Sequence, residues 1–107
     1  MADMITELTQ ENFTQEVLNA SEPVLVDFWA IWCSPCRAFS PILEEFAGEH
    51  PKDIKVCKLN VDDCRDLAAA YRVMSIPSVL LFENGEERER AVGIPEALEL
   101  LTRMSEK

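Results

Sequence analysis

Hydrophobic residues form short runs along the chain, and the spacing inside each run predicts a strand or a helix. Residues 24–29 are apolar without alternation except at Asp27, as expected of a central strand covered on both faces. Four other segments have the length and apolar pattern of strands, and they are residues 5–8, 54–61, 76–82 and 87–92. Asn84-Gly85 lies between the last two and favours a type I′ hairpin turn, with the charged second arm as an edge strand.

Residues 36–47 have apolar positions at the spacing of an amphipathic helix. The stripe that would face the core consists of Phe39, Leu43, Phe46 and Ala47. Pro41 lies inside this helix and should kink it, because proline removes a backbone hydrogen bond. His50 follows near the end of the helix, and we expect it to be a solvated side chain rather than a catalytic one.

Three more helices are expected from caps and spacing. Thr9 is a candidate N-cap for a helix that runs to about residue 20. A short helix is expected at residues 66–71. Pro95 would occupy the first position of the last helix. The core-facing residues of that helix are expected to be Ala97, Leu98, Leu101 and Met104. The order of elements is therefore βαβαβαββα.

Length and charge narrow the class of protein. A chain of 107 residues can bury one hydrophobic core but not two, so residues 1–107 are interpreted as a single α/β domain. Its net charge of −10 repels phosphate backbones, and no nucleic acid partner is expected. No apolar run approaches the roughly 18 residues of a membrane span, and residues 1–4 lack the features of a signal peptide. We expect a cytoplasmic protein without a membrane partner.

The motif Cys33-Ser34-Pro35-Cys36 lies where the strand at 24–29 gives way to the helix at 36–47. A strand that stops at a helix start leaves the first sulfur among unpaired backbone N–H groups and the positive end of the helix dipole, where a thiolate is favoured over a thiol. The dipole stabilises a charge by ~0.3–1 kcal/mol, up to ~2 when partly buried. It would therefore lower the pKa of Cys33 by about one unit at most. The thiol of Cys36 is the nearest second donor.

Asp27 is the one charged residue in the predicted central strand. A charge inside a buried strand costs several kcal/mol unless it is paired or protonated. Two interpretations are open: Asp27 lies at an exposed strand end, or it is a buried acid with a raised pKa that moves protons to and from the cysteine pair. We favour the buried acid.

The residues around these features resemble the thioredoxins. The resemblance covers residues 5–104 approximately and is specific because separate motifs agree in order and spacing. These motifs are Asp27, Phe28-Trp29-Ala30, Trp32-Cys33-Ser34-Pro35-Cys36-Arg37, Pro41, Lys58-Leu59-Asn60-Val61-Asp62, Ile76-Pro77, Asn84-Gly85 and Gly93. The resemblance implies the thioredoxin fold, a five-stranded mixed sheet flanked by four helices on its two faces.

The activity implied by the resemblance is reduction of protein disulfides by a thiol–disulfide oxidoreductase that donates electrons to cytosolic target enzymes. Cys33 would be the nucleophile and Cys36 the resolving cysteine. Asp27 would be the proton relay, with water assisting, and Lys58 its partner, because the family has a lysine close to the buried aspartate. The reduced form would be restored by a thioredoxin reductase drawing on NADPH. The chain itself is expected to be a monomer without a bound cofactor or metal.

The resemblance also implies a docking surface for substrate around the two sulfurs. In the family the proline that matches Pro77 is cis and lies against the sulfurs, which leaves the backbone of the residue before it free to pair with a substrate strand. The candidate substrate-binding residues are Trp32, Ser34, Pro35, Ile76, Pro77 and Gly93. Ser34 replaces a usual glycine, and Met74-Ser75 replaces a pair that often ends in glycine. We expect these departures to affect partner choice and reduction potential rather than reaction type.

Two other functions are compatible with parts of the sequence. A structural zinc site would use Cys33, Cys36, Cys57 and Cys64, but zinc ribbons pair two tight Cys-x-x-Cys knuckles and Cys57 lies inside a predicted strand. A pure interaction module would not need a redox motif together with its predicted proton relay. We expect Cys57 to pack as a small buried hydrophobe, and Cys64 to lie in a surface loop or first helical turn, where it could form an intermolecular disulfide.

Overall fold

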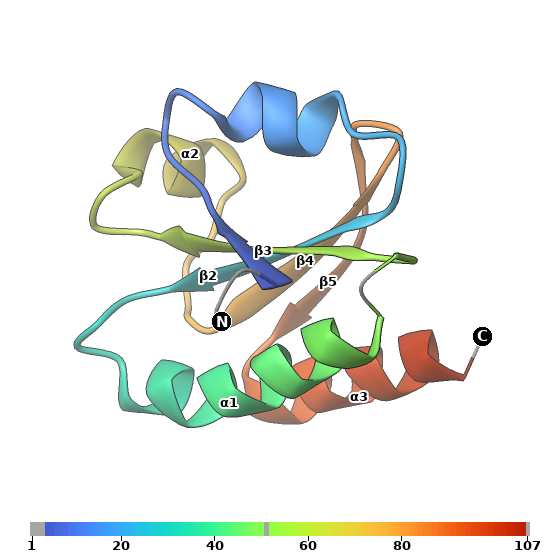
Figure 1. The fold of residues 1–107 in the computed structure, drawn as a ribbon. Coiled ribbons are helices and arrows are strands. Elements are labelled where there is room, and N and C mark those ends of the chain that lie inside the picture. Colours follow the sequence, from blue (N-terminus) through green and yellow to red (C-terminus); the bar gives the residue numbers. More distant parts are fainter. Residues whose placement is uncertain (1–3, 51, 107) are drawn as a thin grey trace.

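The computed structural model describes residues 4–50 and 52–106, and its centre is a five-stranded sheet (Figure 1). The strands are β1 (Ile5–Glu7), β2 (Val24–Trp29), β3 (Lys55–Asn60), β4 (Ser78–Glu83) and β5 (Glu86–Val92). Their order in the sheet is β1-β3-β2-β4-β5. β1, β3 and β2 are parallel, whereas β4 is antiparallel to both β2 and β5. The predicted mixed sheet is confirmed.

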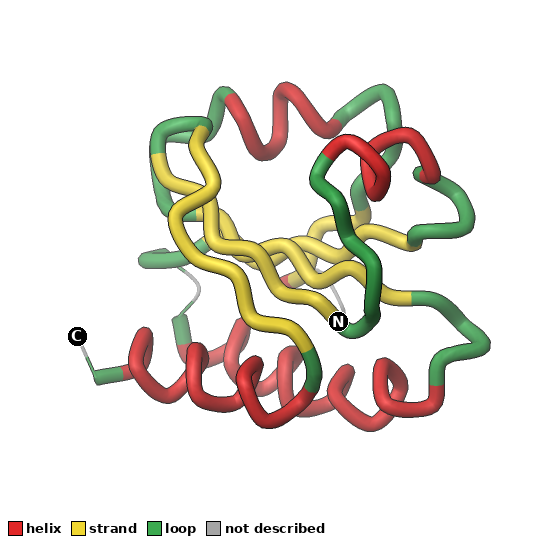
Figure 2. The backbone as a smooth tube through the Cα atoms, turned by 180° about the vertical axis from the view of Figure 1, so that it is seen from behind, coloured by secondary structure: helices red, strands yellow, loops and turns green. Residues whose placement is uncertain are grey.

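Helices cover both faces of this sheet (Figures 1 and 2). α1 (Ser34–Glu49) and α3 (Ile94–Ser105) lie side by side on one face. The opposite face is covered by α2 (Arg65–Ala70) and by a π-helical turn, η2 (Thr14–Leu18). The α/β fold with four flanking helices is therefore confirmed. No helix of the described chain combines the length and the apolar composition that crossing a membrane requires.

β2 is the central strand, and its side chains alternate between two cores. Val24, Val26 and Phe28 pack in the core under η2 and α2, whereas Leu25 packs in the core under α1 and α3. This burial on both faces explains the apolar run without alternation. By the same alternation, Asp27 lies on the face covered by α1.

The first helix is shorter than predicted. The predicted N-cap Thr9 is wrong, since the N-cap of η2 is Phe13, which makes no side-chain capping bond. Thr9 Oγ1 accepts a hydrogen bond from the Asn12 N–H at 3.0 Å, but this bond lies in the turn before the helix. The Asn12 side chain, however, accepts from the Thr9 N–H at 2.8 Å and donates to the Glu7 carbonyl at 3.1 Å. These two bonds of the Asn12 side chain hold residues 9–12 as a turn. They satisfy main-chain groups that would otherwise form the backbone hydrogen bonds of a helix. Regular helical structure is confined to η2.

The last helix begins one residue earlier than predicted, because Gly93 is its N-cap and Pro95 its second residue. Leu98 is 38% exposed, so its predicted place in the core is wrong. Leu100 is buried instead. It lies three residues after Ala97 and therefore on the same, core-facing side of the helix, whereas Leu98 directly follows Ala97 and points away from that side. The predicted hairpin is confirmed by positive φ angles of 54° at Asn84 and 81° at Gly85.

Candidate active site

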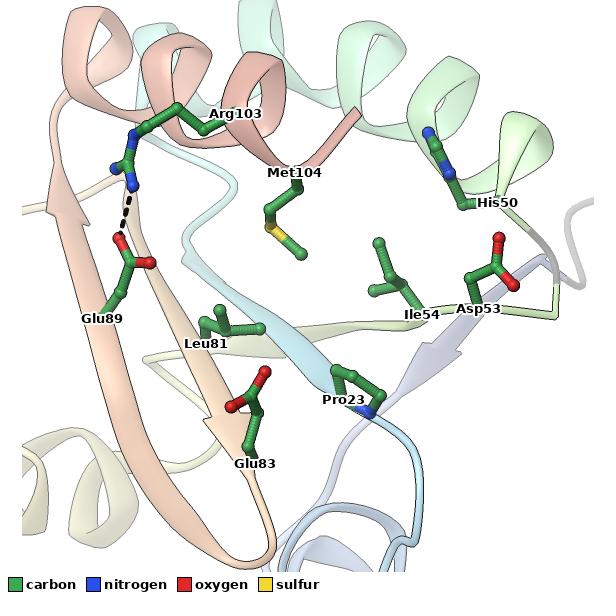
Figure 3. A pocket seen from close by; sticks show the side chains of 9 residues that line it. All are labelled: Pro23, His50, Asp53, Ile54, Leu81, Glu83, Glu89, Arg103 and Met104. Atoms are coloured by element: carbon green, nitrogen blue, oxygen red, sulfur yellow. Dashed lines mark hydrogen bonds and ion pairs between the residues drawn. The ribbon is translucent and has the colours of Figure 1, made fainter. Parts of the chain in front are cut away.

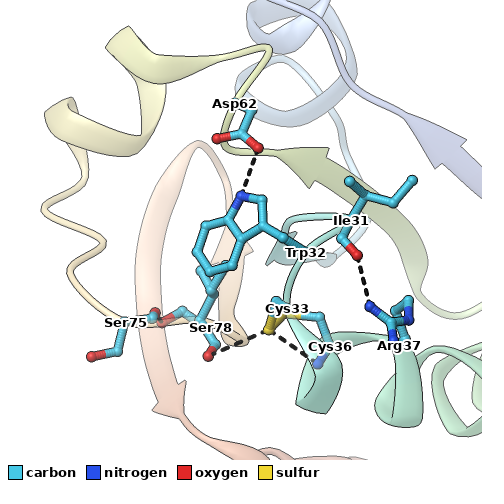
Figure 4. The surroundings of a disulfide bond; sticks show 9 residues. Ile31, Trp32, Cys33, Cys36, Arg37, Asp62, Ser75 and Ser78 are labelled. Carbon is cyan, nitrogen blue, oxygen red and sulfur yellow. Dashed lines mark hydrogen bonds between the residues drawn. A yellow bond between two sulfur atoms is a disulfide. The ribbon is translucent and has the colours of Figure 1, made fainter.

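The cysteine pair lies where β2 leads into α1 (Figure 4). Cys33 is the N-cap of α1, Cys36 lies in the first turn, and a disulfide joins them. The Cys36 backbone N–H donates to Cys33 Sγ at 3.2 Å. The sulfur of Cys33 thus faces the N-terminus of a 16-residue helix whose first turn contains no acidic residue. This placement favours a thiolate on Cys33 when the disulfide is reduced.

The loop before β4 brings a second segment to the sulfurs. The Ile76–Pro77 peptide bond is cis, and the Ile76 carbonyl oxygen lies 3.8 Å from Cys33 Sγ. The main chain of this segment is tied to β5, because the Gly93 N–H donates to the Pro77 carbonyl at 2.8 Å. The fold therefore brings together Ile76, Pro77 and Gly93, three of the candidate substrate-binding residues. Ser34 and Pro35 lie exposed between the two sulfurs in sequence.

Three exposed apolar side chains, called the rim here, belong to the segments that reach the disulfide: Ile31 and Trp32 directly precede Cys33, and Met74 lies two residues before Ile76. Ile31 is 68% exposed, Trp32 66% and Met74 90%. Trp32 Nε1 donates to Asp62 Oδ2 at 2.8 Å, and Arg37 Nη1 donates to the Ile31 carbonyl at 2.8 Å (Figure 4). Neither Asp62 nor Arg37 was predicted to have a role at the site. The position of Asp62 near Trp32 could have been predicted from the sequence. Asp62 follows β3, which is parallel to β2, and parallel strands bring their carboxyl ends to the same edge of a sheet.

Asp27 is buried, with 1% of its surface exposed, so the alternative of an exposed strand end is wrong. Neither carboxylate oxygen has a hydrogen-bond partner in the part of the chain that the structure describes. Burial raises the pKa of Asp27 to about 7, and the positive charge of Lys58 opposes this rise. A carboxyl group with this pKa can accept or release a proton near neutral pH.

Lys58 lies opposite Asp27 in the pairing of β2 with β3. Its Nζ donates to Ser40 Oγ of α1 at 2.9 Å and lies 4.5 Å from the centre of the Trp29 ring. Within residues 4–50 and 52–106, no direct ion pair joins Lys58 to Asp27. Lys58 thus lowers the pKa of Asp27 through its positive charge and not through a hydrogen bond. Its contacts with Ser40 and Trp29 were not predicted.

The other two cysteines are buried in the core under η2 and α2. Cys57 was expected there, and burial raises its pKa to about 12. The expected surface position of Cys64 is wrong, since it is 1% exposed and its Sγ lies 3.8 Å from the Leu8 carbonyl oxygen. The chain segment after β1 covers it, and burial followed by nearby acidic residues raises its pKa. A buried neutral thiol is a poor nucleophile, which removes the basis for dimerisation through Cys64.

A pocket of about 240 Å³ opens at the opposite end of the sheet from the disulfide (Figure 3). Its lining includes His50, which is the C-cap of α1 and packs on Phe46 with 4.6 Å between the ring centres. No cysteine lines this pocket, and His50 is remote from the sulfurs. Among the described residues, no three His, Cys, Asp or Glu side chains are arranged to hold a metal ion.

The chain matches the family model for thioredoxin over residues 4–106. It is 45% identical to a thioredoxin of Rickettsia bellii over 91 residues, which cover 85% of this chain and 87% of the relative. It is also 45% identical to thioredoxin C-2 of Corynebacterium nephridii over 93 residues, covering 87% of this chain and 86% of the relative. The chloroplastic thioredoxin M5 of rice (Oryza sativa subsp. japonica) is 43% identical over 93 residues, covering 87% of this chain and 54% of the relative.

Proposed function

Because this chain belongs to the thioredoxin family, and so is a thiol–disulfide oxidoreductase that reduces protein disulfides, we propose that it carries electrons from a thioredoxin reductase to target enzymes in the cytosol. The observation that supports the chemistry most directly is the Cys33 sulfur at the N-cap of α1, within hydrogen-bond distance of the Cys36 N–H and bonded to Cys36. The reactive form for this transfer is the dithiol.

The reaction proceeds in two exchange steps. The Cys33 thiolate attacks one sulfur of the target disulfide, which forms a mixed disulfide and releases the first target thiolate. The Cys36 thiolate then attacks Cys33 Sγ and releases the second target thiolate, which leaves the Cys33–Cys36 disulfide. Two electrons pass to the target. The two protons of the original dithiol end on the target thiols or in solvent.

Asp27 is proposed as the group that takes the proton from Cys36 before the second step, with a water molecule between them. Its burial on the α1 face and its pKa of about 7 support this role, because a base must be partly ionised at the working pH. Lys58 is proposed to keep that pKa from rising further, through its positive charge rather than through a hydrogen bond.

Target segments are proposed to dock across the rim beside the disulfide. Trp32 supplies an exposed apolar surface, and the main chain at Ile76 supplies a group for pairing with an extended strand. Gly93 is proposed to border the docked segment, since its own N–H and carbonyl are bonded to Pro77 and Ala97. Pro77 positions the Ile76 carbonyl near Cys33, while Ser34 and Pro35 form the exposed surface between the cysteines.

The electron source and cellular setting complete the proposal. A flavin-dependent reductase would return the disulfide to the dithiol with electrons from NADPH, and the chain would need no cofactor of its own. We propose a cytoplasmic monomer whose residues 1–107 form one domain, with neither nucleic acid nor membrane as a partner. The net charge of −10 supports the exclusion of nucleic acid.

Insulin reduction tests the proposal in two stages. Catalytic amounts of the protein should accelerate insulin precipitation by dithiothreitol, and should couple NADPH consumption to insulin when a bacterial thioredoxin reductase is added. The variant Cys33→Ser is the control and should do neither. Failure with dithiothreitol would contradict disulfide reduction, whereas success with dithiothreitol and failure with all reductases tried would contradict the proposed electron source.

A further inference from the structure

Residues 71–77 join α2 to β4 and are called the rim loop here. The loop carries Met74, which is 90% exposed, and the Ile76 carbonyl, which lies 3.8 Å from Cys33 Sγ. The loop thus carries an exposed apolar side chain two residues before the main-chain group that lies at the Cys33 sulfur. A loop of this kind binds more tightly when it is ordered in advance, because ordering it during docking costs binding free energy.

The rim loop begins with an unusual backbone turn. Arg72 has a φ of 56°, in the left-handed region that non-glycine residues seldom adopt. The Arg72 N–H donates to the Ala69 carbonyl at 3.0 Å and the Val73 N–H to the Ala68 carbonyl at 2.9 Å. These two bonds form a Schellman motif, which usually has glycine at the position of Arg72. The turn therefore carries a conformational cost that contacts outside the helix must offset.

Arg90 of β5 supplies such contacts. Its Nη2 donates to the Tyr71 carbonyl at 2.6 Å and its Nη1 donates to the Arg72 carbonyl at 3.2 Å. Glu87 fixes the orientation of the guanidinium group, since it accepts from Nε at 2.7 Å and from Nη2 at 3.0 Å. The planar guanidinium fork makes all four bonds at once, which the single ammonium group of a lysine could not do.

The rest of the loop is held at other points. The Tyr71 ring lies 5.6 Å from Phe13 and 5.4 Å from Phe82, so the core anchors the beginning of the loop from inside while Arg90 holds its carbonyls from outside. Near the end of the loop, Ser78 Oγ donates to the Ser75 carbonyl at 2.5 Å. Met74 lies between these points, and its side chain is 90% exposed.

We propose that Arg90 is a positioning residue for disulfide reduction, which holds the start of the rim loop so that Met74 and the Ile76 carbonyl meet a docked target segment in a preformed arrangement. This inference rests on the proposed docking of targets across the rim. Arg90 lies on the edge strand and takes no part in sulfur exchange. Its loss should therefore weaken productive docking and leave the chemistry of Cys33 intact.

The experiment compares Arg90→Met with Arg88→Met. Arg88 is a matched control, because it lies on the same strand with the same charge but pairs with Glu83 and Glu86 near the hairpin. For Arg90→Met we expect KM for insulin to rise about threefold to tenfold, the effect of losing hydrogen bonds from a charged group, with kcat within about twofold. Reduction of a small aromatic disulfide should be unchanged in both variants, since it needs no extended docking. Arg90→Lys should be intermediate.

Hydrogen exchange of the rim loop provides a readout that does not depend on activity. In Arg90→Met, amides of residues 73–76 should exchange faster than in wild type and in Arg88→Met, at an unchanged unfolding midpoint. Equal KM values and equal exchange in the two variants would overturn the proposal, as would a fall in kcat for the small disulfide. If wild type itself fails to reduce insulin, the proposed function fails, and the exchange data alone then decide whether Arg90 holds the loop.

Discussion

Cys33 and Cys64 are both N-cap residues, the first of α1 and the second of α2. The Cys33 sulfur accepts a hydrogen bond from the Cys36 N–H, whereas Cys64 makes no side-chain capping bond. No acidic residue lies in the first turn of α1, but Asp63 precedes α2 and Asp66 lies in its first turn. Both sulfurs are about equally hidden, at 5% and 1% exposure of their residues.

The difference shows what makes an N-cap cysteine reactive. Each sulfur lies 3.8 Å from a carbonyl oxygen, that of Ile76 for Cys33 and that of Leu8 for Cys64, so this contact does not separate them. What differs is the surrounding charge, because burial together with Asp63, Glu11 and Glu7 raises the pKa of Cys64. α2 is also only six residues long, which makes a weaker dipole than the 16 residues of α1. Position at a helix start is therefore not enough to make a cysteine reactive. The sulfur must also face the helix N–H groups, and no negative charge may lie nearby.

The largest expected effect comes from exchanging sulfur for oxygen at these two caps. Cys33→Ser should lose insulin reduction by at least about a thousandfold, because it removes the thiolate proposed to form the mixed disulfide. Cys64→Ser should keep activity within about twofold, since its thiol takes no part in exchange. In Cys36→Ser, mixed disulfides with targets should accumulate on Cys33 and be visible by mass spectrometry. Adducts found mainly on Cys57 or Cys64 would break the contrast between the two caps.

The next largest effect concerns Asp27, the buried acid near the Cys33 site; the acidic residues around Cys64 have no such proposed role. Asp27 lies in the core on the α1 side, where burial raises its pKa to about 7. Removing it in Asp27→Asn should slow resolution of the mixed disulfide by about tenfold or more near neutral pH, where Cys36 is mainly thiol. Stopped-flow measurement of target release across the pH range gives the profile. Full activity at every pH would remove Asp27 from the mechanism.

The same substitution has an expected effect on stability. The unfolded chain ionises Asp27 near 3.8 and the folded chain near 7, so stability conferred by the protonated carboxyl is lost as pH rises through this range. Asp27→Asn should therefore exceed wild type by about 2–4 kcal/mol in urea unfolding at about pH 8, and the gain should shrink toward about pH 4. Glu44→Gln removes an exposed carboxylate of α1 and should show little of this pH dependence. A gain that is independent of pH would contradict a raised pKa.

Local patterns in the sequence were sufficient for most of the fold. The apolar run at β2, the stripe on α1 and Asn84-Gly85 each specify one element through period or turn chemistry, and all three were predicted. The burial of Asp27 also followed from its place in an apolar run. The N-cap position of Cys33 followed from the junction of a strand with a helix.

Several residues were misplaced or missed because their surroundings come from segments that are distant in the sequence. Cys64 is buried because residue Leu8, 56 positions away, lies over it, and no local pattern contains that contact. The bond from Trp32 to Asp62 depends on the pairing of β2 with β3. In the sequence, Arg90 is one of several charged residues on a predicted edge strand. Its hydrogen bonds to the carbonyls of Tyr71 and Arg72 are visible only in the folded structure.

The smallest expected effect is a tuning of the Cys33 site by its neighbour. Ser34 is the first residue of α1 and is exposed, and within the described residues its hydroxyl makes no hydrogen bond. If it does bond to the thiolate after reduction, one neutral hydrogen bond contributes about 0.5–1.5 kcal/mol. Since ~30 mV corresponds to ~1.4 kcal/mol for a two-electron couple, Ser34→Gly should shift the reduction potential by at most about 30 mV.

Equilibration of wild type and Ser34→Gly against a glutathione series measures this shift. Cys64→Ser serves as the control, because Cys64 lies across the sheet from the disulfide and should leave the potential unchanged. We expect both proteins to remain net reductants in a glutathione-buffered cytosol. A shift near ~100 mV is several times what one hydrogen bond supplies at ~30 mV per ~1.4 kcal/mol. It would mean that Ser34, and not the N-terminus of α1 alone, sets the thiolate stability that separates Cys33 from Cys64.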